Sequence, residues 1–127
     1  MRARNAYLSN SIHTASGPSL LLMLLDRLRT DVEQALAHQE LDDHESASTR
    51  LLHAQDIVSE LLSSLDVDLC PGGENLAAVY DWILRGLIDA NVGRDVTTTR
   101  DCLLVVTQVV DVWHEAAAHA AGAAAIA

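Results

Sequence analysis

The segment from residue 18 to residue 37, PSLLLMLLDRLRTDVEQALA, indicates the fold more clearly than any other part of the chain. Its apolar residues recur at intervals of three and four, which is the period of one face of an α-helix. Ser16 can cap this helix, and Pro18 is tolerated in its first turn. The apolar stripe consists of Leu21, Leu24, Leu28, Val32 and Ala35, widened by Leu22, Leu25 and Leu36. We therefore expect a long amphipathic helix here.

The rest of the chain repeats this period three times. The further predicted helices cover residues 46–65, 74–90 and 96–119. The polar stretch 38–45 is expected to be a loop, Asn91 or Gly93 suits the left-handed end of the third helix, and Asp95 can cap the fourth. Four helices with short connections predict an all-α fold, an antiparallel four-helix bundle.

The length of 127 residues fits one domain, so we expect a single helical bundle over residues 1–127. Residues 1–15 are polar and are expected to form an N-terminal arm or short helix. Residues 116–127 are rich in alanine, and this tail is expected either to extend the last helix or to fray.

The composition excludes several classes of function. The formal net charge is −10, and all eight basic residues are arginines, so the chain repels nucleic acid and anionic lipid. No apolar run approaches the ~20 residues of a membrane-spanning helix, and no signal-peptide core follows Arg2 and Arg4. Cys70 and Cys102 are isolated, as is usual for reduced thiols. We expect a cytoplasmic protein without nucleic-acid partners or membrane insertion.

No arrangement of residues predicts a catalytic centre. His38, Asp42, Asp43 and His44 lie in one polar loop and could hold a divalent ion weakly, which would fit a metal enzyme. A solvated loop explains them without a site. Cys102 lies on an apolar helix face and is expected to be a small buried hydrophobe. We therefore predict no enzyme activity, no catalytic residue, no metal and no cofactor.

The apolar stripes are wider than the core of a bundle requires, and surplus apolar surface is typical of a partner-binding face. The candidate partner-binding residues on the second and third predicted helices are Ile57, Leu61, Leu65, Leu76, Tyr80, Ile83, Leu84 and Leu87. We expect about half of them to line a groove and the rest to lie in the core, because apolar stripes usually face a core. Tyr7 and Ile12, which are isolated apolar residues in the polar arm, complete the set.

Several segments, in order over residues 6–115, resemble the bacterial flagellin export chaperones of the FliS type. They are Ala6-Tyr7, Leu20–Asp26, Ala54–Leu61, Ser64-Leu65-Asp66, Gly72–Leu76 and Val79–Trp82. The chain departs from the family pattern at Gly17, Leu25 and Arg27, which affects local packing rather than the assignment.

The resemblance implies a monomeric or weakly dimeric four-helix bundle that acts in the cytoplasm. Such a protein binds the disordered C-terminal segment of flagellin, prevents premature polymerisation and presents the subunit to the flagellar type III export gate, without a cofactor. The arm would cover the groove or contact the export gate, and a purely structural anchor is an equal alternative. From the residues alone, the competing hypothesis is a self-associating structural bundle whose stripes bury against a second copy.

Overall fold

The computed structural model describes residues 17–126 of the chain. In this range the chain forms helices and no strand: α2 (Gly17–Glu40), α3 (His44–Ser64), α4 (Gly73–Val92) and α5 (Val96–Ile126). The predicted all-α bundle is confirmed. The N-terminal arm, with Tyr7, Ile12 and the expected cap Ser16, lies outside the described residues.

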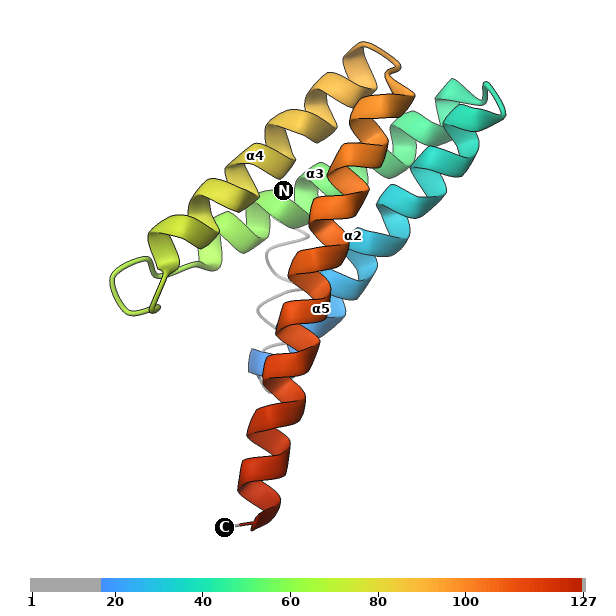
Figure 1. The fold of residues 1–127 in the computed structure, drawn as a ribbon. Coiled ribbons are helices and arrows are strands. Elements are labelled where there is room, and N and C mark those ends of the chain that lie inside the picture. Colours follow the sequence, from blue (N-terminus) through green and yellow to red (C-terminus); the bar gives the residue numbers. More distant parts are fainter. Residues whose placement is uncertain (1–16, 127) are drawn as a thin grey trace.

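The four helices form a closed ring of contacts. Each helix packs against the next one along the chain, and α5 also packs against α2. Figure 1 shows that successive helices run in opposite directions, so that the connections alternate between the two ends of the bundle. The last part of α5 extends past the other helices (Figure 1). The alanine-rich tail therefore continues the helix, which reaches Ile126 rather than ending near residue 119.

The core is aliphatic and follows the predicted stripes. A fully buried Leu, Ile or Val side chain contributes roughly 1.5–3 kcal/mol, so this set dominates stability. The buried apolar residues of α2 and α3 are Leu25, Leu28, Val32, Ala35, Ala47, Leu51, Ala54, Ile57, Val58 and Leu61. Those of α4 and α5 are Tyr80, Ile83, Leu87, Ala90, Cys102, Val106 and Val110.

One buried carboxylate links α2 to α3. Asp31 on α2 is fully buried, and its oxygens lie 3.5 Å from the Arg50 guanidinium and next to the His53 ring, both on α3. Arg27, one turn earlier on α2, adds a longer contact of 3.8 Å. A buried charge is tolerated only when it is paired in this way, so these contacts fix the register of the two helices.

The connection between α2 and α3 is shorter than predicted. The stretch 38–45 is mostly helical, because α2 continues to Glu40 and α3 begins at His44. Asp42 adopts a left-handed φ of 57°, and the Asp43 amide then donates to the His38 carbonyl at 2.9 Å, which closes α2. The Asp43 carboxylate accepts from the Ser46 amide at 3.2 Å and caps α3. One short polar turn therefore ends one helix and starts the next.

The turn between α4 and α5 corrects a second expectation. Gly93 has a right-handed conformation, and the left-handed residue is Arg94, with a φ of 51°. The Asp95 amide donates to the Ala90 carbonyl at 3.0 Å across this turn. The predicted cap of α5 is confirmed, since the Asp95 carboxylate accepts from the Thr98 amide at 3.2 Å.

Two glycines permit close approaches of the backbone. A Cβ atom on Gly73, at the start of α4, would lie 2.7 Å from the Val67 carbonyl oxygen. A Cβ atom on Gly86 would lie 2.5 Å from the Cys102 sulfur of α5. A larger residue at Gly73 would push against the Val67 backbone, and one at Gly86 would force the buried Cys102 side chain or α5 to shift. Gly86 thus sets how closely α4 and α5 pack.

Candidate partner-binding surface

A line of apolar side chains on α4 is not covered by the bundle. Ile88 and Val92 lie four residues apart on one side of α4 and are 41% and 81% exposed. Leu84, one turn before Ile88, continues the line and is half-buried. Leu52 of α3 is 51% exposed and lines the same pocket as Val92. We call these four residues the apolar band.

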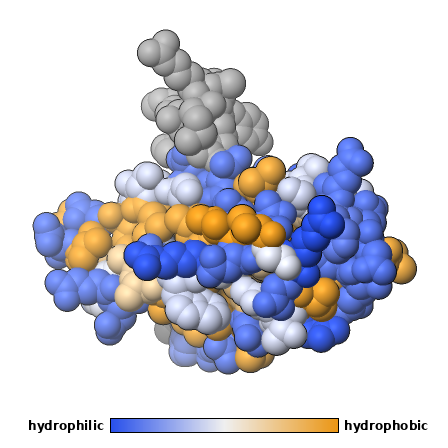
Figure 2. Space-filling view, turned by 90° about the horizontal axis from the view of Figure 1, so that it is seen from above, coloured by the Kyte–Doolittle hydropathy of each residue, from blue (hydrophilic) through white to orange (hydrophobic). Residues whose placement is uncertain are grey.

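The surface view agrees with this grouping. Figure 2 shows apolar side chains gathered in an elongated strip on one face of the molecule, with polar residues along both sides. Exposed apolar residues scattered singly are common on proteins, but a continuous strip is typical of an interaction site. Because Leu84, Ile88 and Val92 follow one another along α4, the apolar band suits an extended or helical segment of another chain.

The structure separates the predicted partner-binding residues into two groups. Ile57, Leu61, Tyr80, Ile83 and Leu87 are buried in the core. Leu65, Leu76 and Leu84 are half-buried and pack against the core from outside. The second group can touch a partner without any opening of the bundle, whereas the first group requires helices to separate. The role of both groups in binding is still a prediction, and Tyr7 and Ile12 lie outside the described residues.

Sequence reasoning missed Leu52, Ile88 and Val92 as members of this surface and predicted only Leu84. A signal for Val92 was present, since Leu84, Ile88 and Val92 recur every four residues beside the core stripe of α4. Such a second stripe predicts a second contact surface. Leu52 has no comparable signal, because its neighbour Leu51 is the core residue and either could face inward.

Tyr80 belongs to the core rather than to the surface. Burial raises the pKa of its hydroxyl to about 12, and a hydrogen bond with Trp113 of α5 offsets only part of that rise. The phenol is therefore uncharged at neutral pH. Tyr80 and Trp113 together connect α4 to α5.

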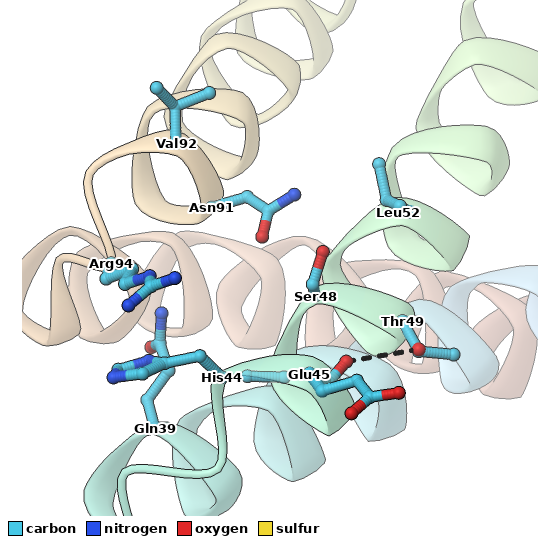
Figure 3. Close-up of a pocket in the computed structure, with 10 residues that line it drawn as sticks. Gln39, His44, Glu45, Ser48, Thr49, Leu52, Asn91, Val92 and Arg94 are labelled. Atoms are coloured by element: carbon cyan, nitrogen blue, oxygen red, sulfur yellow. Dashed lines mark hydrogen bonds between the residues drawn. The ribbon is translucent and has the colours of Figure 1, made fainter.

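A polar pocket of about 560 Å³ lies at the end of the bundle where α2 ends, α3 begins and α4 ends. Figure 3 shows the side chains of Asn91 and Ser48 pointing toward one another across it. Arg94 lies beside Gln39 and His44 on one side of the pocket (Figure 3). Leu52 and Val92 also line it, so the pocket and the apolar band are continuous.

The residues that were considered as metal ligands or nucleophiles, in the stretch 38–44 and at Cys102, lie in surroundings that do not favour that chemistry. The His38 ring nitrogen lies 3.5 Å from the Asp43 carboxylate in the α2–α3 turn. Between residues 17 and 126, no three His, Cys, Asp or Glu side chains are grouped so that they could hold a metal ion. Cys102 is fully buried, as predicted, and burial followed by the nearby Asp101 and Asp89 raises the pKa of its thiol to about 11. A neutral thiol is a poor nucleophile.

No helix in the described range is long and apolar enough to cross a membrane. A helical bundle with a strip of exposed apolar side chains is typical of the class of proteins that bind segments of other chains. The sequence comparisons name the family within that class.

The chain belongs to the family described as "Flagellar protein FliS", whose sequence model matches residues 1–120. It is also similar to a characterised relative, the "Flagellar secretion chaperone FliS" of Bacillus subtilis (strain 168). The two sequences are 32% identical over 111 residues, which cover 87% of this chain and 83% of the relative. The family predicted from the sequence is thus confirmed.

Proposed function

We propose that this chain is a flagellar secretion chaperone that binds the disordered C-terminal segment of flagellin in the cytoplasm. In this proposal it prevents premature polymerisation and delivers the subunit to the flagellar type III export gate. Membership of the FliS family and the name of the Bacillus subtilis relative support the chaperone role. The observation that carries the binding step is the apolar band along α3 and α4.

The geometry of the band fits a helical guest. Leu84, Ile88 and Val92 are spaced by one helical turn, so an amphipathic segment lying along α4 can place its own apolar anchors between them. Ordering a disordered segment costs roughly 2–5 kcal/mol, which the burial of a long apolar surface must offset. A strip that runs along a helix provides that length, whereas a single pocket does not.

The charge of the chain complements this role. A net charge of −10 keeps a protein with exposed apolar surface from self-associating, because copies repel one another. The proposed function is holding and delivery, so it requires neither a catalytic residue nor a cofactor. The chain would act as a monomer or a weak homodimer that forms a complex with one flagellin.

The first test measures binding to flagellin with and without its C-terminal segment by isothermal titration calorimetry. We expect a stable complex with the full subunit and no measurable binding after the segment is deleted. Retained binding to the shortened subunit would contradict the proposal. A tight homodimer by light scattering, together with no flagellin binding, would favour the self-associating bundle instead.

The second test places a charge in the band. Ile88→Asp and Val92→Asp change exposed positions, so the bundle should still fold, and a buried carboxylate at the interface should weaken binding at least about tenfold. Leu104→Asp on α5 is the matched control, because Leu104 is also exposed but lies on another helix. Leu61→Asp is unsuitable, since Leu61 is a core residue. Normal binding by both band variants would show that flagellin docks elsewhere.

A further inference from the structure

The polar pocket at the end of the bundle contains two buried polar atoms that have no hydrogen-bond partner among residues 17–126. Gln39 is only 3% exposed, and its amide nitrogen donates to the Ala90 carbonyl at 3.4 Å. Its Oε1 atom has no hydrogen-bond partner, and the same is true of His44 Nδ1. Turning the Gln39 amide over would place oxygen against the Ala90 carbonyl, so the observed orientation is the better one. A buried acceptor without a hydrogen bond is costly, so the binding of a ligand that donates an N–H group to Gln39 Oε1 would be favourable.

The same pocket carries an unpaired positive charge. Among the six arginines between residues 17 and 126, five form ion pairs with Asp or Glu. Arg94 forms none with any residue that the structure describes, although the chain is strongly acidic. Its left-handed backbone at the α4–α5 turn sets the side chain beside Gln39 and His44 (Figure 3). An arginine held at such a position is available to an anionic ligand.

The other charged group of the pocket does not oppose an anion there. Glu45 is a lining residue, but Figure 3 shows its carboxylate pointing away from Arg94. The pocket is also lined by the first turn of α3, and the N-terminal end of a helix favours negative charge. The polar side chains of Asn91 and Ser48 supply further hydrogen bonds to a ligand between them.

One common chemical group offers an anion and an N–H donor within one residue, namely the carboxyl end of a polypeptide. We propose that the pocket binds the terminal carboxylate of the guest chain through Arg94, while the amide of the last residue donates to Gln39 Oε1. This inference rests on the proposed function, because the apolar band leads into the pocket past Leu52 and Val92. Gln39 Oε1 is not exposed, so this contact requires the side chains around it to shift when the guest enters.

The test uses two synthetic peptides of the flagellin C-terminal segment that differ only at the last group. One has a free carboxylate and the other a C-terminal amide, and each is titrated into the full chain. We expect the acid to bind about tenfold more tightly, because only its carboxylate can form a charge-assisted hydrogen bond with the exposed Arg94. Arg94→Gln should reduce binding of the acid to the level of the amide and leave the amide unchanged. At equal peptide concentration the side-chain amide signals of Gln39 should shift more with the acid peptide, because Arg94 then holds the last residue against Gln39.

Arg85→Gln is the matched control, because Arg85 is an exposed arginine of α4 outside the pocket. This variant should keep the tenfold preference for the acid. Equal binding of the two peptides to the unaltered chain would overturn the inference while leaving the proposed function intact. A preference that survives in Arg94→Gln would overturn it as well, because the carboxylate would then be bound elsewhere. Failure of both peptides to bind would overturn the proposed function together with the inference.

Discussion

At the scale of single residues, the lack of a side chain at Gly86 allows α4 and α5 to pack closely. Gly86 faces the Cys102 sulfur so closely that a methyl group has no room. The cysteine is fully buried and has no disulfide partner in the described part of the chain. Here a glycine is required by the neighbouring helix and not by its own backbone, since it lies inside α4.

Gly86→Ala should destabilise the bundle by about 1–3 kcal/mol, as insertion of a methyl group into a packed core usually does. Urea unfolding followed by circular dichroism measures this change. Combining it with Cys102→Ala should cost less than the sum of the two single changes, because the shorter side chain makes room. Gly122→Ala is the control, since nothing lies within 4 Å of that position. A neutral Gly86→Ala would show that α4 and α5 pack less closely than described.

At the scale of helices, the sequence predicted the number and type of elements but not all of their ends. Apolar periodicity determined the four helices because each core stripe is long and regular. The stretch 38–45 was expected to be a loop on account of its polarity, yet polar residues are equally compatible with the exposed side of a helix. The left-handed position was assigned to Asn91 or Gly93, which adopt it readily, but tertiary contacts placed Arg94 there.

The helix caps lead to a prediction about pH. Hydrogen bonds with Ser46 lower the pKa of the Asp43 carboxyl, and hydrogen bonds with Thr98 lower the pKa of Asp95 in the same way. When folding lowers the pKa of a carboxyl, the charged carboxylate stabilises the folded state. This stabilisation is fully present at a pH above the pKa of the carboxyl in the unfolded chain, and it is lost as the pH falls through the lower pKa of the folded chain. The urea midpoint should therefore be constant from about pH 7 to pH 5 and fall below about pH 4.

Variants of the caps separate this effect from other carboxylates. Asp43→Ala and Asp95→Ala should lower the midpoint at pH 7 and flatten its decline below about pH 4. Asp81→Ala is suited as a control, because Asp81 pairs with Arg85 inside α4 and caps no helix. An unchanged pH dependence in both cap variants would show that other groups cause the decline.

At the scale of the whole molecule, the sequence could not assign the wide apolar stripes to an inner and an outer surface. On α4, each of the buried residues Tyr80, Ile83 and Leu87 lies one to four residues from Leu84 or Ile88, which face outward. Rotating α4 by less than a third of a turn would exchange their environments, and only the positions of α3 and α5 decide the rotation. The lining of the polar pocket could not be predicted from the sequence either, because Gln39, His44 and Arg94 lie at or next to the ends of three different helices and meet only in the folded chain.

The arrangement of the whole molecule also predicts that the end of α5 is dispensable for stability. Side chains from Ala118 to Ala123 are exposed, and Figure 1 shows this part of the helix extending past the bundle. A chain that ends at Ala117 should lose helical signal but change its unfolding free energy by less than about 0.5 kcal/mol, as surface changes away from packed contacts do. It should also bind flagellin as before, because the apolar band lies on α3 and α4. By contrast, a chain that ends before Trp113 removes the partner of Tyr80 and should be clearly less stable. Equal losses from the two truncations would place part of the core in the tail.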